Sequence, residues 1–216
     1  MPDDFRLPSP LYAIADTTQT EMRSIPALVE RMIAAGVRIV QLRVKNPSAA
    51  EFFELARILR HVTSQSDCAL VINDRVDIAV AVDADGVHLG QEDLPISAAR
   101  PLTGQKIIGV STHSLEQART AEKEGADYIG FGPLFGTQTK DTGFAPRGVE
   151  MLARVRKAVR VPIVAIGGIT LDNVSDAWQH GADSAAMISY LAGDDTQERV
   201  TKVLHRARTR GVDVSG

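Results

Sequence analysis

Cysteine is almost absent from this chain of 216 residues, which contains only Cys68. One cysteine excludes a disulfide within the chain and any zinc site built from cysteines. An excess of charge of one sign is also missing, because the formal net charge is −3. No global basic field therefore exists to attract nucleic acid or an anionic membrane. Any phosphate site must be built from local groups.

Long apolar runs are missing too. No stretch approaches the roughly 18 apolar residues of a membrane-spanning helix. The first ten residues carry Asp3 and Asp4 and lack the apolar centre of a secretory signal. We therefore expect a cytoplasmic protein with no membrane or nucleic-acid partner.

The composition is that of a globular domain, with 44% hydrophobic and 24% charged residues. The length suits one domain of the barrel type, which runs from about 200 residues upward. We expect residues 1–216 to form a single domain with flexible tails at about 1–10 and 211–216. The sequence leaves the oligomeric state open.

Short β-branched segments alternate with amphipathic ones along the whole chain. Several of the short segments are continuously apolar, as parallel strands buried on both faces are. Eight strand–helix units of about 27 residues each favour an α/β fold of the TIM (β/α)8 barrel type. The expected strands are 11–15, 39–43, 69–72, 86–89, 107–111, 128–132, 162–166 and 184–188. The expected helices are 25–35, 49–63, 115–124, 149–159 and 173–180, with shorter ones near 77–82 and 96–100.

Glycine recurs just before expected strands, at Gly36, Gly125 and Gly181. Each is predicted to end a helix in the left-handed conformation. An open doubly wound sheet is the alternative fold. The first strand is not followed by a Gly-x-Gly-x-x-Gly turn, which favours the barrel.

Polar residues gather where the expected strands end, and in a barrel these ends line the active site. The set combines cations, carboxylates, hydroxyls and glycine, a mixture that suits phosphate groups and a hard metal ion. Its members are Gln41, Arg43, Lys45, Asn73, Asp74, Asp93, Ser111, Thr137, Gln138, Thr139, Lys140, Gly168, Ile188 and Ser189.

Asp74 and Asp93 follow consecutive strands and could share one ion. Mg²⁺ typically takes one or two protein carboxylates and fills its other positions with water and phosphate oxygens. An aspartate after a strand is also a common helix cap or turn former. Asp77 is the better candidate for the cap of the next helix, which leaves Asp74 for a metal.

The cations Arg43 and Lys45 lie two apart, so both can point the same way from one strand. Arginine grips phosphate bidentately, whereas lysine acts as a mobile point charge. A solvated surface pair is the alternative. Lys140 lies in a long segment rich in glycine and threonine, of the kind that often forms a lid or a binding loop.

Gly167 and Gly168 follow a strand and precede a helix. Glycines there let backbone N–H groups approach an anion, which a helix N-terminus also favours. Barrels often place a phosphate site after strands seven and eight, so Ile188 and Ser189 would supply its other half. His88 lies within an apolar strand, and we interpret it as a core histidine.

These segments resemble the thiamine phosphate synthase family. The resemblance runs from about residue 11 to 191 and is most specific at Asn-Asp-Arg (73–75) and His-Leu-Gly-Gln-Glu-Asp (88–93). It extends to 109–113, 128–135, 137–140 and 165–169. It implies a Mg²⁺-dependent transferase that joins 4-amino-2-methyl-5-pyrimidinylmethyl diphosphate to 4-methyl-5-(2-phosphoethyl)thiazole and releases diphosphate.

The resemblance also implies residue roles. The groups for the pyrimidine diphosphate are Gln41, Arg43, Lys45, Asn73, Ser111 and Lys140, and those for the thiazole phosphate are Thr137, Gln138, Thr139, Gly168, Ile188 and Ser189. Asp74 and Asp93 would hold Mg²⁺. Lys140 and Arg43 would be catalytic, because they neutralise the departing diphosphate.

One position departs from the family, which often has an acidic residue where this chain has Val44. Strand alternation should point Val44 away from Arg43 and Lys45. Three other functions remain open: a thiazole tautomerase, a non-catalytic barrel that binds thiazole phosphate, and a phosphosugar isomerase. The tautomerase resembles the synthase but carries a histidine where this chain has Pro133.

Overall fold

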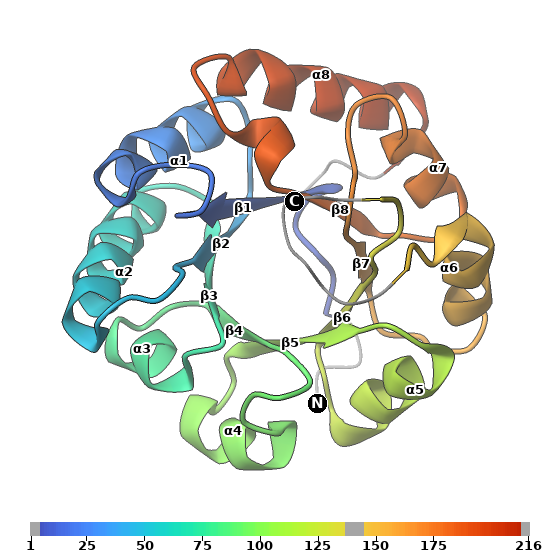
Figure 1. The fold of residues 1–216 in the computed structure, drawn as a ribbon, viewed down its shortest axis with the longest axis horizontal. Coiled ribbons are helices and arrows are strands. Elements are labelled where there is room, and N and C mark those ends of the chain that lie inside the picture. The colour runs from blue at the N-terminus through green and yellow to red at the C-terminus, as the bar shows by residue number, and fades with distance from the viewer. Residues whose placement is uncertain (1–4, 137–144, 213–216) are drawn as a thin grey trace.

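The computed structural model describes residues 5–136 and 145–212. Its centre is a closed barrel of parallel strands in the order β1 to β8, with helices around the outside (Figure 1). Strand β1 pairs with β8 as well as with β2, which closes the sheet. The expected TIM barrel is confirmed, and the open doubly wound sheet is excluded.

The elements follow one another in strict alternation. The strands are β1 (Leu11–Asp16), β2 (Ile39–Arg43), β3 (Ala69–Asn73), β4 (Gly86–Leu89), β5 (Ile107–Thr112), β6 (Tyr128–Phe131), β7 (Ile163–Ala165) and β8 (Ser184–Met187). The helices are α1 (Ile25–Ala34), α2 (Ala49–Ser64), α3 (Val76–Ala81), α4 (Ile96–Thr103), α5 (Leu115–Glu124), α6 (Gly148–Arg156), α7 (Val174–Gln179) and α8 (Thr196–Thr209). Two short 3₁₀ helices are η1 (Met22–Ser24) and η2 (Ser189–Leu191). No helix of the described residues is long and apolar enough to cross a membrane.

Hydrophobic residues fill two regions, because each strand is buried on both faces. The larger cluster lies between the strands and the helices. The smaller one fills the barrel interior and includes Tyr12 and Tyr128. Phe5 and Leu7 pack against this interior cluster. Residues 5–10, which we expected to belong to a flexible tail, are thus part of the packed structure.

Backbone conformation confirms the predicted helix ends but corrects one predicted cap. Gly36, Gly125 and Gly181 have φ angles of 105°, 92° and 101°, in the left-handed region that glycine favours. Asp77 is not the cap of α3, because Arg75 occupies the N-cap position. The Asp77 carboxylate instead accepts two hydrogen bonds from the Arg75 guanidinium, at 2.8 and 2.5 Å. Asp77 thus lies within the first turn of the helix and pairs with the residue at the N-cap.

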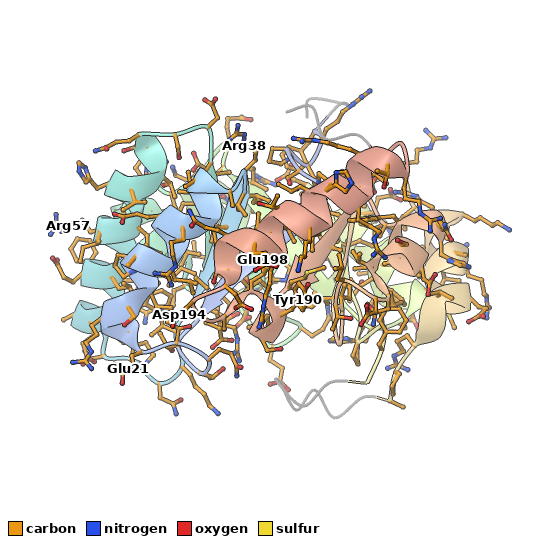
Figure 2. The ribbon with its side chains drawn as sticks, turned by 90° about the horizontal axis from the view of Figure 1, so that it is seen from above. Glu21, Arg38, Arg57, Tyr190, Asp194 and Glu198 are labelled. Carbon is orange, nitrogen blue, oxygen red and sulfur yellow. The ribbon has the colours of Figure 1, made fainter. Side chains whose placement is uncertain are left out.

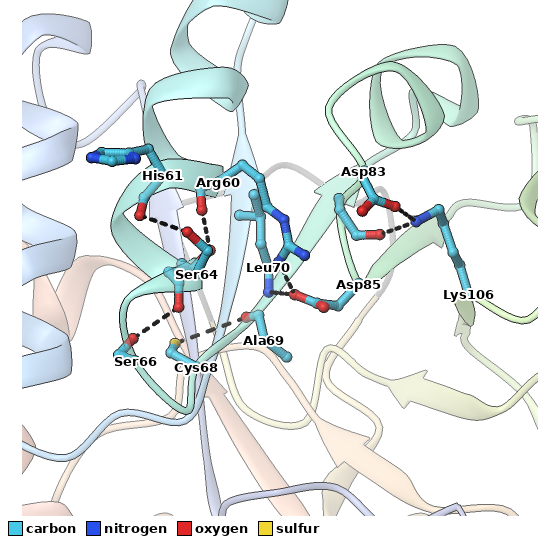
Figure 3. Close-up of polar contacts among 12 residues, drawn as sticks. Arg60, His61, Ser64, Ser66, Cys68, Ala69, Leu70, Asp83, Asp85 and Lys106 are labelled. Carbon is cyan, nitrogen blue, oxygen red and sulfur yellow. Dashed lines mark hydrogen bonds and ion pairs between the residues drawn. The ribbon is translucent and has the colours of Figure 1, made fainter.

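An aspartate just before β4 clamps the N-terminal end of the barrel (Figure 3). The Asp85 Oδ2 atom accepts from the backbone N–H of Leu70 at 2.8 Å and from Arg60 Nη1 at 3.0 Å. The contact joins the start of β3 to the start of β4 and to helix α2. It satisfies a strand N–H that has no ladder partner at this edge.

The same clamp recurs before β6 and β8, where the sequence again reads Ala-Asp. In each, one carboxylate oxygen accepts from a strand N–H and from an arginine of the preceding even-numbered helix. The second clamp joins Asp127 to Ile108 N and Arg100, both at 2.7 Å, and the third joins Asp183 to Ile163 N at 2.8 Å and Arg156 at 3.0 Å. Three matched clamps therefore hold the barrel end that lies away from the strand C-termini.

The two ends of the barrel are distinct in a side view (Figure 2). Arg38, which immediately precedes β2, lies at the upper edge of the view. Glu21 follows β1 and Asp194 follows β8, and both lie in the lower half. The C-terminal ends of the strands, where we expect the site, therefore face the end opposite Arg38.

Candidate active site

An opening at the C-terminal ends of the strands leads into the barrel. The cavity at its base has a volume of about 50 Å³. Five of the predicted site residues line it together: Gln41, Arg43, Asn73, Ser111 and Ile188. The rest of the lining consists of Tyr12, Ile14, His88, Tyr128, Gly130, Val164, Ile166 and Ala186. The structure thus brings together residues of β2, β3 and β5 that are far apart in the sequence.

Arg43 is held at this opening by Asp16. The two residues are register partners at the ends of β1 and β2. Arg43 Nη1 donates to Asp16 Oδ2 at 2.5 Å, and the Asp16 side chain is fully buried. The backbone N–H of Thr18 donates to the other carboxylate oxygen at 2.7 Å. Asp16 fixes the guanidinium at the rim, where its remaining N–H groups can donate to an anion. The sequence reasoning missed Asp16, although its signal, a carboxylate ending an apolar strand, was present.

A chain of buried polar groups crosses the interior below the opening. Gln41 Nε2 donates to the Tyr12 hydroxyl at 3.0 Å, and the Tyr12 and Tyr128 hydroxyls are 2.7 Å apart. The Tyr128 hydroxyl is 2.9 Å from His88 Nδ1, and His88 Nε2 is 2.8 Å from Ser111 Oγ. Burial raises the pKa of both phenols, so both remain protonated at neutral pH. The chain therefore joins two predicted substrate-binding residues, Gln41 and Ser111, through uncharged phenols.

His88 is buried, as expected for a core histidine, but both of its ring nitrogens face polar partners. The two tyrosines were not predicted as site residues. A tyrosine within an apolar strand is usually read as packing, and only the closed barrel brings β1 and β6 together across the interior.

The two predicted metal ligands lie beside the opening rather than in its lining. Asp93 Oδ2 accepts from the backbone N–H of Gly90 at 2.6 Å, which orients the carboxylate. Asp74 has a φ of 64°, and its backbone N–H donates to the carbonyl oxygen of His88 at 2.8 Å. Among the described residues, no group of three or more histidine, cysteine or acidic side chains could hold a metal. Two carboxylates suffice for Mg²⁺, which takes its other ligands from water and phosphate.

Asp74 also borders a second hollow, on the outer surface. This groove is lined by Arg75, Val80, Leu94 and Leu102, among others, and lies between α3 and α4. Its walls are largely apolar, and it lies outside the barrel.

Lys45 and Val44 differ in environment from Arg43. Lys45 is exposed and lies outside the lining of the opening, and its backbone N–H donates to Thr17 Oγ1 at 3.0 Å. Val44 is partly buried and packs against the outer hydrophobic cluster. The predicted direction of Val44, away from Arg43, is therefore confirmed. The ion pair that orients Arg43 comes from β1 and does not need an acidic neighbour on β2.

The turn after β7 has a left-handed backbone and is closely packed. Gly168 has a φ of 65°, and its carbonyl oxygen accepts from Asn173 Nδ2 at 2.9 Å. A Cβ atom on Gly168 would lie 2.3 Å from the carbonyl oxygen of Gly136. A side chain here would thus displace the segment after β6 as well as any bound phosphate. Ile188 and Ser189 lie at the start of η2, directly after β8. Thr137, Gln138, Thr139 and Lys140 lie outside the described residues, so their roles stay predictions.

Comparison with known proteins agrees with this geometry. The family model described as thiamine monophosphate synthase matches residues 11–191. The thiamine-phosphate synthase of Chloroflexus aurantiacus is 46% identical over 186 residues, which cover 86% of each chain. That of Halalkalibacterium halodurans is 47% identical over 191 residues, covering 88% of this chain and 89% of the relative.

A solved structure shows the same similarity in three dimensions. The thiamine phosphate pyrophosphorylase from Pyrococcus furiosus is 37% identical, with a TM-score of 0.84 over 95% of this chain and 97% of the other. Sequence, fold and the residues at the opening point to one family. This chain belongs to the thiamine monophosphate synthase family and is a transferase of that family.

Proposed function

We propose that the opening at the C-terminal ends of the strands binds 4-amino-2-methyl-5-pyrimidinylmethyl diphosphate and transfers its pyrimidinylmethyl group to the thiazole phosphate. One observation carries the proposal: Asp16 anchors Arg43 in the lining of the same opening as Gln41, which donates to the protonated phenol of Tyr12. A fixed cation suits a diphosphate, and neutral donors and acceptors suit an uncharged heterocycle.

The bond changes are a substitution at the methylene carbon. The bond between this carbon and the diphosphate oxygen breaks, and diphosphate leaves with the electron pair. The thiazole nitrogen then forms the new bond with its lone pair. Electron donation from the amino group stabilises the positive charge on the pyrimidinylmethyl group. The protein supplies no nucleophile in this reaction.

Arg43 contributes by charge. Negative charge accumulates on the leaving diphosphate, and a cation that is already oriented stabilises it without reorganising. The fully buried Asp16 carboxylate keeps the guanidinium in place at the opening. Lys140 is proposed to act on the same diphosphate.

Asp74 and Asp93 are proposed to hold Mg²⁺. The donor set fits the ion, because Mg²⁺ takes one or two protein carboxylates and fills its other positions with phosphate oxygens and water. The hydrogen bond from Gly90 occupies one oxygen of Asp93 and fixes the direction of the carboxylate. When bound, Mg²⁺ supplies positive charge that lowers the energy of the departing diphosphate.

The thiazole phosphate is proposed to bind at the turn after β7 and the start of η2, at Gly168, Ile188 and Ser189. Gly168 has a positive φ, which favours glycine, and because glycine has no side chain the backbone there stays accessible to a phosphate. Thr137, Gln138 and Thr139 are proposed to complete this site, and Asn73, Ser111 and Lys45 to contact the pyrimidine diphosphate. The cytoplasmic location is proposed on the sequence alone.

The proposal is tested by incubating the purified protein with both substrates and MgCl₂ and measuring thiamine phosphate and free diphosphate. We expect the two products in equal amounts. Omission of either substrate should stop formation of thiamine phosphate. Isomerisation of the thiazole phosphate without consumption of the pyrimidine would instead identify a tautomerase.

A further inference from the structure

The end of β6 lies between the two halves of the proposed site. Strand β6 pairs with β5, which carries Ser111 of the pyrimidine half, and with β7, which leads to Gly168 of the thiazole half (Figure 1). The proposed reaction joins two molecules, so the two half-sites must hold them at bonding distance. The contacts that fix the end of β6 against its two neighbours therefore help to set the spacing of the substrates.

The segment after β6 is held on the β7 side by backbone contacts. The N–H of Leu134 donates to the carbonyl oxygen of Ile166 at 2.7 Å, and the N–H of Phe135 donates to that of Gly167 at 3.0 Å. A Cβ atom on Gly167 would lie 2.6 Å from Pro133 Cα, so the two backbones are in close contact. This segment and the turn after β7 thus form one packed unit.

The β5 side is held by one backbone bond and by a histidine side chain. The N–H of Gly132 donates to the carbonyl oxygen of Thr112, the last residue of β5, at 3.2 Å. The carbonyl oxygen of Gly132 is 2.5 Å from His113 Nδ1. Gly132 is buried, and a buried carbonyl group needs a donor. His113 thus extends the contact between β5 and β6 beyond the last residue of β5.

This contact fixes one proton of the imidazole. A carbonyl oxygen can only accept, so Nδ1 of His113 carries a proton whether the ring is neutral or charged. The first turn of α5 holds the backbone of the same residue. Gln117 Oε1 accepts from the His113 N–H at 2.7 Å, and Ser114 Oγ accepts from the Gln117 N–H at 3.1 Å. His113 is therefore a donor whose backbone is anchored to α5.

We propose that His113 is a positioning residue that sets the spacing between the pyrimidine and thiazole half-sites. It follows Ser111 by two residues and holds the carbonyl group of Gly132. The segment after Gly132 is in turn bonded to the turn that leads to Gly168. His113 lies outside the lining of the opening, so it acts through Gly132 and not on a substrate. The inference rests on the proposed function and adds to it a residue that touches neither substrate.

The spacing decides which group captures the pyrimidinylmethyl cation once its bond to diphosphate has broken. If the thiazole nitrogen donates its lone pair to the methylene carbon, the product is thiamine phosphate. If a water oxygen does so instead, the water loses a proton to solvent and the product is the pyrimidinylmethyl alcohol. A thiazole that is held too far from the carbon therefore gives way to water.

The first test measures diphosphate, thiamine phosphate and the alcohol with both substrates at saturation. The wild type should release about one diphosphate per thiamine phosphate. His113→Ala removes the donor, so we expect the rate of thiamine phosphate formation to fall about tenfold or more. The ratio of diphosphate to thiamine phosphate should rise to about two or higher, and the alcohol should account for the difference. The KM for each substrate should change by less than about threefold, because each half-site keeps its own contacts.

Two further variants identify the ring atom that is responsible. Asparagine can place an N–H near the position of Nδ1, whereas the longer glutamine places it near that of Nε2. His113→Asn should therefore return the product ratio to about one, and His113→Gln should behave like His113→Ala. The matched control is His180→Ala, which removes an exposed histidine whose Nδ1 lies 2.7 Å from the carbonyl oxygen of Asp176. This control should keep the wild-type ratio.

Loss of stability alone would lower the amount of folded protein and leave the product ratio unchanged. A ratio near one in His113→Ala overturns the inference, and so does a raised ratio that asparagine lowers no more than glutamine does. If the wild type forms no thiamine phosphate, the proposed function is wrong and the inference is wrong with it.

NMR of the wild-type protein without substrates tests the contact independently of the proposed function. Long-range ¹H–¹⁵N spectra of histidine-labelled protein distinguish protonated from unprotonated ring nitrogens, and the signal lost in His113→Asn belongs to His113. We expect a proton on its Nδ1 atom. An unprotonated Nδ1 overturns the inference even where thiamine phosphate is formed.

Discussion

Asp16 and Arg43 join the ends of two neighbouring strands through an ion pair of 2.5 Å in which the carboxylate is fully buried. The Arg43 side chain is 19% exposed and lines the opening of the barrel. A buried anion thus orients a cation that a diphosphate can still reach.

The first prediction concerns this pair. Asp16→Asn removes the charge while keeping the size of the side chain, so Arg43 loses its anchor. We expect the KM for the pyrimidine diphosphate to rise about tenfold or more, and the free energy of unfolding to fall by about 1–3 kcal/mol. Steady-state kinetics and urea unfolding measure the two effects.

The control for Asp16 is Glu54→Gln, which breaks an exposed arginine–carboxylate pair on α2 at 2.5 Å. Exposed pairs contribute little to stability, so neither quantity should change measurably. An unchanged KM in Asp16→Asn would show that Arg43 does not need Asp16 to meet its substrate.

The second prediction concerns the metal. EDTA should abolish turnover and Mg²⁺ should restore it. Asp93→Asn can still accept from the Gly90 N–H but offers the ion no charge, so we expect kcat/KM to fall roughly a hundredfold and more Mg²⁺ to be required. Asp77→Asn, which removes a nearby carboxylate paired with Arg75, should leave the Mg²⁺ requirement unchanged. Full activity after exhaustive removal of metal would contradict the site.

The third prediction concerns the clamps at the other end of the barrel. Asp127→Ala leaves the Ile108 N–H without its acceptor and removes the carboxylate partner of Arg100, so the free energy of unfolding should fall by about 1–3 kcal/mol. The side chains of Asp127, Asp85 and Asp183 are 17%, 34% and 47% exposed, respectively. Because water screens exposed pairs, the losses on mutation to alanine should fall in that order. Chemical denaturation tests the order, and kcat should stay unchanged because the clamps lie far from the opening. A large loss of kcat in a stably folded variant would argue against this separation of roles.

The fourth prediction concerns pH. Burial raises the pKa of the Cys68 thiol to about 12, from a usual value of 9. Between these values the unfolded chain loses the proton while the folded chain keeps it. The unfolded state is therefore favoured as pH rises above about 9, and stability from this group, complete below pH 9, is lost towards pH 12.

Urea unfolding from pH 8 to 10.5 measures this effect, and Cys68→Ala should show a smaller decline over the same range. Other groups titrate in both proteins, so the difference between the two slopes reports Cys68. Native Cys68 should also resist iodoacetamide at pH 8 and react once urea unfolds the chain. Equal slopes together with rapid labelling of the native protein would show that the thiol is not buried.

The repeating elements of the barrel could be predicted closely from the sequence. The β2 and β4 strands and helix α5 begin and end at the predicted residues, because apolar runs and glycine caps mark their boundaries. Helix α8 was missed, although Val200, Val203, Leu204 and Ala207 form a buried stripe along it. Most residues of this helix are charged or polar, so the few apolar ones do not stand out in the sequence. Their burial is evident only once the helix packs against the barrel.

The site residues at the strand ends could be predicted from the sequence, whereas the buried residues that orient them could not. Gln41, Arg43 and Ser111 follow from their positions at strand ends, since a barrel gathers those ends at one opening. Asp16 ends an apolar strand, which is a local signal, but its partner Arg43 lies on the next strand. Tyr128 acts through contacts with other strands, and no local pattern marks it. Asp77 was predicted to be the cap of α3, but the helix already begins at Val76, so Asp77 lies within its first turn and pairs with Arg75.

The most direct measurement is a crystal structure of the protein with MgCl₂ and an unreactive analogue of the pyrimidine diphosphate. The account predicts the ring in the barrel opening between Gln41 and Ser111, the diphosphate on Arg43, and a metal ion bound by Asp74 and Asp93. An analogue bound in the apolar groove between α3 and α4, or a diphosphate remote from Arg43, would contradict it.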